Sequence, residues 1–198
     1  MAKRLNLVLL QGDTFSRVIR WETPPFVYKP ITGITQAAPA VITAIAHSLA
    51  TGWRVAVVSV QGMREINAEN DPPRDSEYRQ VTVTDVDHVA LNKVNSAEFD
   101  PYTSGGYLQF YTPVDLAGYT ARMTIKDRVG GTVLHTLVSP TDIVIDNSAH
   151  TITLTISAII TAGWTWVTST YDLELVSAAG VVTKLYKGSI TITKEVTT

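Results

Sequence analysis

The sequence predicts an all-β protein, organised as a sandwich or a barrel, and three observations support this. Short runs in which apolar and polar residues alternate recur at regular spacing, with turn signals between them. The hydrophobic residues, 45% of the chain, are mostly Val, Ile, Leu and Ala, and Thr is abundant. β-Branched side chains favour strands over helices. Almost no segment has helical periodicity, and 198 residues suffice for one large β domain or two small ones.

The first strands are expected at residues 4–10 and 15–21, with a turn at 11–13 between them. In the second strand, alternation places Phe15, Ile19 and Trp21 on one face with Arg17. Residues 23–25, Thr-Pro-Pro, are expected to end that strand, because proline has no N–H to donate to a ladder.

The middle of the chain is expected to be a series of short strands. They are predicted at residues 31–35, 40–46, 53–60, 78–84, 89–91 and 107–111. A loop ending in Gly52 covers residues 47–52, a polar proline loop covers 70–76, and a turn covers 85–88. Gly105 and Gly106 mark the exit towards the last of these strands.

The C-terminal part is expected to contain paired strands and one short helix. Strands are predicted at residues 120–127, 132–138, 143–145 and 151–156, with a tight turn at Gly130-Gly131. Residues 157–163 suggest a helical turn with Ser157 as N-cap.

The clearest element is a hairpin over residues 171–196. Its first arm alternates Tyr171, Leu173 and Leu175 with acidic residues, and a glycine turn follows at 177–180. The return arm carries Val181, Thr183, Leu185 and Lys187 and then, after Gly188, Ile190 and Ile192.

Composition excludes several functions. The chain has no cysteine, so disulfides, thiolate zinc sites and cysteine nucleophiles are absent. A net charge of −2 gives no reason to expect nucleic-acid binding. No apolar run approaches the roughly 18 residues that span a bilayer, and the apolar run after the basic N-terminus, interrupted by Asn6, is too short for a signal peptide. We therefore expect that the protein does not insert into a membrane and that it is synthesised in a cytoplasm.

No group of residues predicts catalysis, a metal site or a cofactor. The histidines at 47, 88, 135 and 150 are isolated, and none lies in a ligand-type spacing. Asp172 and Glu174 lie two residues apart on one strand face, either as a carboxylate pair or as a solvated face, and the second interpretation is favoured. Nucleophile motifs and phosphate-binding glycine loops are missing. We expect a protein that is not an enzyme.

Four aromatic residues are candidate partner contacts. Trp164 and Trp166 lie two residues apart, and Phe26 and Tyr28 flank Val27 beside two prolines. Exposed aromatic rings on a β scaffold can anchor a partner or stack on sugars. The alternative is that at least one of the tryptophans packs in the core, as large aromatic residues usually do.

Three passages together resemble a known family. They are residues 115–123, residues 143–146 with 151–157, and residues 171–175 with the glycine turn and 188–196. Their order resembles small tail and baseplate proteins of tailed bacteriophages, including the N-terminal domain of upper baseplate proteins. The opening residues 11–15 and 19–21 fit the start of the same domain.

The middle of the chain resembles a different module. Residues 34–35, 39–43, 47–52, 54–55 and 62–67 look like a small β-barrel found in phage tail proteins, which is similar to the first catalytic-cysteine half-domain of ubiquitin-activating enzymes. Because this chain has no cysteine, no ubiquitin chemistry carries over.

The two resemblances imply an architecture and a role. The architecture is an Ig-like or jelly-roll-type β-sandwich host, residues 1–29 and 112–198, with a small β-barrel module inserted at residues 30–111. The implied role is a structural virion protein, a tail or baseplate component that connects the tail to fibres or receptor-binding proteins. It would be assembled in the host bacterial cytoplasm, as a homo-oligomer within the virion tail, with other tail, baseplate or fibre proteins as partners. The alternatives are a carbohydrate- or receptor-binding module of the tail and a capsid decoration protein.

Overall fold

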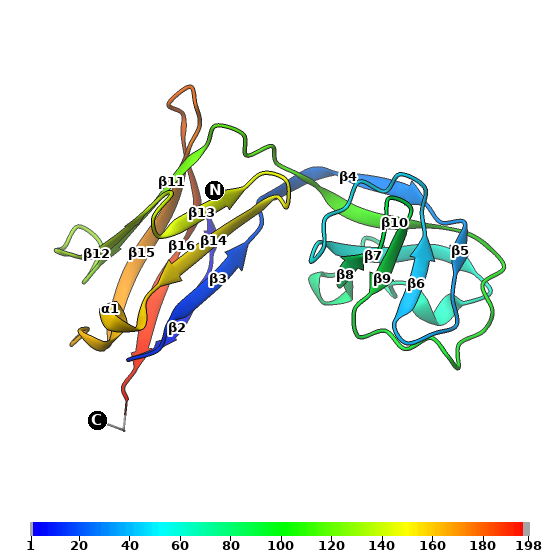
Figure 1. The fold of residues 1–198 in the computed structure, drawn as a ribbon, viewed down its shortest axis with the longest axis horizontal. Coiled ribbons are helices and arrows are strands. Elements are labelled where there is room, and N and C mark those ends of the chain that lie inside the picture. Colours follow the sequence, from blue (N-terminus) through cyan, green and yellow to red (C-terminus); the bar gives the residue numbers. More distant parts are fainter. Residues whose placement is uncertain (1, 196–198) are drawn as a thin grey trace. The chain divides into compact units, whose positions relative to one another are not determined.

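A computed structural model describes residues 2–195 and confirms a mostly-β protein. Its only α-helix in this range is short, Ala158–Ala162 (α1), and the 3₁₀ turns Arg64–Ile66 and Asp75–Glu77 are shorter still. The chain folds as two compact units (Figure 1): residues 2–21 with 114–195, and Glu22–Pro113. The units divide at residues 21/22 and 113/114, whereas the sequence predicted that the chain passes between host and inserted module at 29/30 and 111/112. No helix in the described range is long and apolar enough to span a membrane.

The first unit contains two sheets. The larger one has the strand order β1 (Lys3–Arg4), β16 (Val182–Thr193), β15 (Thr168–Val176), β11 (Thr120–Lys126) and β12 (Val133–Val138), and β2 (Leu7–Leu10) also pairs with β16. β1 and β2 run parallel to β16, and the other pairs are antiparallel. The smaller sheet has the antiparallel order β13 (Ile143–Asp146), β14 (Thr151–Ile156) and β3 (Phe15–Ile19).

Both sheets of the first unit contribute to one apolar core. Met123 and Leu173 come from the larger sheet, and Ile152 and Leu154 come from the smaller one; all four are fully buried. Successive side chains of a strand point to opposite faces, so each sheet can bury one face while the other stays in water. The alternation read from the sequence in β11 and β15 follows from this arrangement.

The C-terminal hairpin forms as β15 and β16, with a bulge that the sequence did not reveal. Leu173 pairs with Tyr186, whereas Glu174 pairs with Lys184, so Leu185 is the extra residue. The apolar positions therefore change phase at Leu185. At Gly188, a Cβ would collide with the carbonyl oxygen of Leu5, next to the β1–β16 pairing.

The second unit contains a single antiparallel sheet that encloses its own core. The strand order is β4 (Glu22–Pro30), β10 (Ser104–Pro113), β7 (Arg54–Gln61), β8 (Arg79–Val83), β9 (His88–Leu91), β6 (Ala40–Thr43) and β5 (Gly33–Ile34). Trp53, Val55, Val81, Val89 and Leu108 lie in the core. β4 and β5 lie at opposite ends of this order, and the described strands show no pairing between them. The described residues thus form no closed barrel, unlike the module expected from the sequence.

Two local expectations need correction at the N-terminal side. The Thr-Pro-Pro sequence does not end a strand, because β4 runs through Pro24 and Pro25. Proline is tolerated there because β4 lies at the end of the sheet and the pairing shifts register opposite, between Tyr111 and Thr112. The strand expected over residues 4–10 is divided into β1 and β2.

The short helix forms where the sequence suggested, but without the expected cap bond. Ser157 occupies the N-cap of α1, yet its side chain makes no capping hydrogen bond. Its backbone carbonyl accepts the N–H groups of Ile160 and Thr161 instead. The side chain of Thr161 donates to the carbonyl of Asp13 at 2.8 Å, which ties α1 to the turn before β3.

Candidate functional site

An aromatic surface lies on the outer face of the second unit's sheet, where β4 pairs with β10. Phe26 lies opposite Tyr111, and Tyr28 lies opposite Gln109. Residues that face each other in an antiparallel pair project to the same side of the sheet. The intervening residue Val27 projects to the other side, where it packs against the core. Alternation along two strands therefore places apolar residues inside and tyrosines outside.

Five rings form a continuous series on this face, which we call the aromatic row. The centroid distances are 6.2 Å from Tyr107 to Tyr28, 6.3 Å from Tyr28 to Phe26, 4.6 Å from Phe26 to Tyr111, and 5.8 Å from Tyr111 to Tyr78. These distances fall within the range of favourable aromatic pairs. Tyr28 is 51% exposed and Tyr107 is 43% exposed, whereas Tyr78 is buried. The row thus runs from an exposed end to a buried end.

The buried end of the row is held by polar contacts. The side-chain amide of Gln109 donates to the hydroxyl of Tyr78 at 3.3 Å. Burial raises the pKa of Tyr78 to about 12, and the Gln109 hydrogen bond opposes this rise. Gln109 and Ala56 are both inaccessible to solvent, although they lie on the outer side of the sheet. The rings therefore shield this face as a second layer of packing.

An ion pair lies beside Tyr78. The guanidinium of Arg54 on β7 donates to the carboxylate of Glu22 at the start of β4, and its carbon lies 5.8 Å from the centroid of the Tyr78 ring. The Glu22 side chain is 6% exposed and the Arg54 side chain is 36% exposed. A partly accessible guanidinium next to aromatic rings is a combination found at protein interfaces.

The four aromatic residues selected from the sequence lie in different environments. Phe26 is half-buried and Tyr28 is exposed, both within the aromatic row. Trp164 is 7% exposed and belongs to the core of the first unit, while Trp166 is half-buried with its centroid 4.7 Å away. Trp164 therefore fits the alternative of core packing better than partner contact.

Sequence reasoning missed the other members of the site. Tyr107, Tyr111, Tyr78, Arg54 and Glu22 were not selected, although Tyr107 and Tyr111 lie at alternate positions of an expected strand. The alternation was a usable signal, since it puts both tyrosines on one face. The pairing of β4 with β10, which brings them to Tyr28 and Phe26, cannot be read locally.

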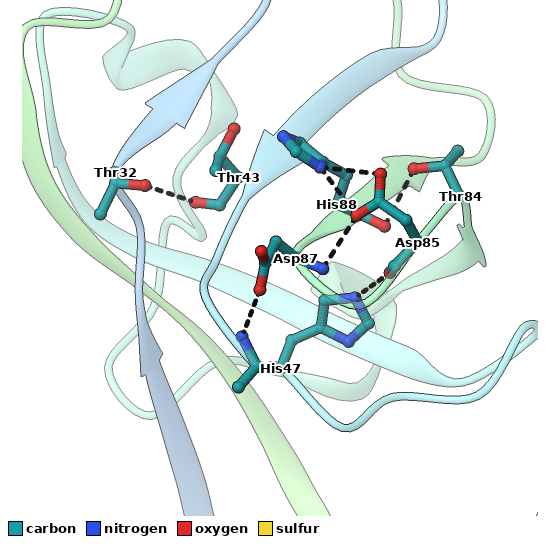
Figure 2. Close-up of polar contacts among 8 residues, drawn as sticks. Thr32, Thr43, His47, Thr84, Asp85, Asp87 and His88 are labelled. Atoms are coloured by element: carbon teal, nitrogen blue, oxygen red, sulfur yellow. Dashed lines mark hydrogen bonds and ion pairs between the residues drawn. The ribbon is translucent and has the colours of Figure 1, made fainter.

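The histidines have structural surroundings. His47 is buried, its Nδ1 accepts the N–H of Leu49 at 2.9 Å, and its Nε2 lies 2.9 Å from the carbonyl of Asp85. Since Nδ1 is an acceptor, Nε2 carries the proton and donates. Figure 2 shows this contact beside His88, whose Nδ1 lies 2.8 Å from the Asp85 carboxylate. The N–H of Asp87 and the imidazole of His88 lower the pKa of Asp85. In residues 2–195 no three acidic or histidine side chains could hold a metal ion.

The paired carboxylates of β15 form ion pairs across neighbouring strands. The ammonium of Lys184 lies 2.8 Å from Asp172, and the guanidinium of Arg122 lies 2.8 Å from Glu174. The hydrogen bond that Lys184 donates to the Asp172 carboxylate raises the pKa of Lys184. This arrangement matches the solvated strand face that the sequence favoured over a catalytic pair.

No protein-family model and no curated protein sequence matches this chain.

Proposed function

We propose that the protein is a structural component of a tailed-bacteriophage virion, a tail or baseplate adaptor that joins the tail to fibres or receptor-binding proteins. In this proposal the first unit is an Ig-like or jelly-roll-type sandwich host and the second unit is an inserted module. The assignment is motivated by the resemblance of residues 115–123, of residues 143–146 with 151–157, and of residues 171–175 with the glycine turn and 188–196. The observation that carries a binding role is the aromatic row.

The aromatic row suits docking of another folded protein. Its exposed end offers Tyr28 and Tyr107, whose rings supply a large contact area with few rotatable bonds and whose hydroxyls can hydrogen-bond. Because the rings already pack against one another, little side-chain entropy is lost on binding. Arg54, one-third exposed, adds a charge for an acidic group of the partner.

The edge strands of the two units suit different modes of contact, which are docking through a sheet face and addition of a strand. β4 ends its sheet but contains Pro24, Pro25 and Pro30, which lack the N–H needed for strand addition. At the β4 end of its sheet, the second unit therefore docks through side chains on its face. β12 ends the larger sheet of the first unit, contains no proline or lysine, and exposes Val133 and Val138. It can accept a strand from a neighbouring copy, and repeated copies supply avidity.

The proposal is tested in intact particles. A photo-crosslinking amino acid is introduced at position 28, and a matched control carries it at Val86, an exposed residue of the same unit outside the row. We expect position 28 to crosslink to another virion protein and position 86 to do so much less. Virions that lack the protein, or equal crosslinking at both positions, would contradict the proposal.

Localisation separates the main proposal from the decoration-protein alternative. Labelling of the protein on particles should mark the tail or baseplate, whereas a decoration protein would mark the capsid. The carbohydrate- or receptor-binding alternative rests on the aromatic residues of the β scaffold, and saturable binding on a glycan array that Trp164→Ala or Trp166→Ala abolishes would favour it.

A further inference from the structure

The second unit contains a hollow of about 560 Å³, which is within the size range of small-molecule sites. Its apolar lining includes Val57 of β7, Leu91 of β9 and the half-buried Phe99. Its polar lining includes Glu69, Arg74 and Lys93, all exposed, from the loops that surround these strands. None of these residues belongs to the aromatic row.

The walls of the hollow are fixed by hydrogen bonds. The carboxylate of Glu77 accepts the backbone N–H groups of Glu69 at 2.6 Å, Asn70 at 3.1 Å and Arg74 at 2.6 Å. The Arg74 N–H makes the largest contribution to lowering the pKa of Glu77. The side chain of Asn67, which also lines the hollow, accepts the backbone N–H of Val60 at 2.9 Å and donates to the Val60 carbonyl at 3.0 Å. A pre-formed site binds with little cost of ordering.

The polar side chains at the rim are available to a ligand. Within residues 2–195, the side chains of Glu69, Arg74 and Lys93 make no hydrogen bond or ion pair, since only the backbone N–H groups of Glu69 and Arg74 are engaged. Lys93 has a φ of +68°, a conformation that costs energy for a residue other than glycine and is often found at functional sites.

The mixture of groups identifies the kind of ligand. An anion needs donors alone, and the carboxylates of Glu65 and Glu69 at the same rim would repel it. A purely apolar ligand would strip water from charged side chains without replacing their hydrogen bonds. Sugar hydroxyls both donate and accept, so they satisfy guanidinium, ammonium and carboxylate together, while a C–H face of the ring packs on the half-buried Phe99.

We propose that this hollow binds a neutral saccharide of one or two sugar units. The proposal goes beyond the docking role of the aromatic row and does not depend on it. The guanidinium of Arg74 and the ammonium of Lys93 donate to sugar hydroxyls, and the carboxylate of Glu69 accepts from them.

The test is an NMR titration of the isotopically labelled full-length protein. The probes are the methyl glycosides of glucose, galactose, mannose and N-acetylglucosamine, with glucuronate and inorganic phosphate as anionic comparisons. We expect saturable shifts of amides in residues 65–79 and 91–99 for at least one neutral glycoside, with weaker effects from both anions. Shifts confined to other segments, preference for an anion, or no binding of any glycoside at the highest soluble concentration would overturn the proposal.

Variants link the binding to the named groups. Arg74→Ala and Glu69→Ala should each lower the affinity for the most tightly bound glycoside about tenfold, as expected for the loss of one charged hydrogen bond. Both side chains are exposed, so the spectra of the variants should otherwise match the parent. The control is Arg64→Ala, an exposed arginine of the same unit that contacts Gln61 and does not line the hollow. Unchanged affinity in both test variants, or an equal loss in the control, refutes the assignment.

Discussion

Replacement of Arg54 by alanine tests the ion pair beside the aromatic row most directly. The change leaves the Glu22 carboxylate, only 6% exposed, without its guanidinium partner. One oxygen of this carboxylate, Oε2, already has no hydrogen-bond partner among the described residues. We therefore expect Arg54→Ala to destabilise the second unit much more than an exposed arginine replacement would.

The size of the effect follows from burial. Removal of one partner from a buried ion pair costs about 3–5 kcal/mol. The Arg54 side chain is 36% exposed, so water partly screens the pair, and we take the lower end, about 3 kcal/mol. Loss of the contact with the Tyr78 ring adds about 0.5–1 kcal/mol. The total is about 3.5 kcal/mol for Arg54→Ala.

A double-mutant cycle separates the pair from simple loss of packing. Glu22→Gln removes the charge that Arg54 compensates, so Arg54→Ala in that background should cost at least about 2 kcal/mol less than in the parent. If the two substitutions are additive, the destabilisation comes from lost packing of the arginine chain and not from the buried carboxylate.

Native-state hydrogen exchange is the appropriate assay, because a protein with two units need not unfold in one step. The amides of β7 and β10 report on the second unit, and those of β14 and β15 report on the first. The reasoning predicts a fall in the opening free energy of β7 and β10 alone. If the opening free energy of β7 and β10 decreases by less than about 1 kcal/mol, the argument that Arg54 compensates a buried charge is refuted.

Three further predictions concern the same structure. Tyr78 has its pKa raised to about 12 from the ordinary value of 10.0, so its contribution to stability is complete below pH 10 and is lost between pH 10 and 12. Tyr78→Phe should reduce the loss of stability over that range, as measured by urea unfolding at several pH values. His47→Ala leaves the Leu49 N–H and the Asp85 carbonyl without a partner and creates a cavity, so exchange in β6 and β9 should report a loss of about 2–3 kcal/mol. Gly188→Ala forces a Cβ against the Leu5 carbonyl and should lower the melting temperature of the first unit while exchange in β7 stays unchanged.

The strands that can be read from the sequence are those with one buried and one solvated face. In β15, the buried Leu173 and Leu175 alternate with Asp172 and Glu174, so periodicity and burial agree. β7 was also predicted, over residues 53–60, but the alternation expected there does not match its burial, because Val55, Ala56 and Val57 are buried in succession. The aromatic row covers the outer side of this strand, and a strand covered on both faces loses its alternation.

Bulges and strand order were beyond local reasoning. The register shift at Leu185 depends on how β16 meets β15, and the passage of β4 through Pro24 and Pro25 depends on its place at the end of the sheet. Neither the strand pairing nor the place of a strand in its sheet can be predicted from the neighbouring residues in the sequence. The same limit applies to the site: Phe26 and Tyr28 could be selected as aromatic residues beside two prolines, but their partners come from strands far away in the sequence.

The gradient of burial along the aromatic row allows stability and binding to be separated by mutation. Tyr78 is buried and hydrogen-bonded to Gln109, so its replacement acts mainly on the fold. Tyr28 and Tyr107 are about half exposed, so their truncation removes little buried area from the free protein. A partner that covers these two rings would bury their remaining exposed area. The double variant Tyr28→Ala with Tyr107→Ala should then weaken assembly, while the opening free energy of β7 changes little. If the double variant unfolds the second unit instead, the whole row belongs to the structural packing of the sheet and the docking surface must lie elsewhere.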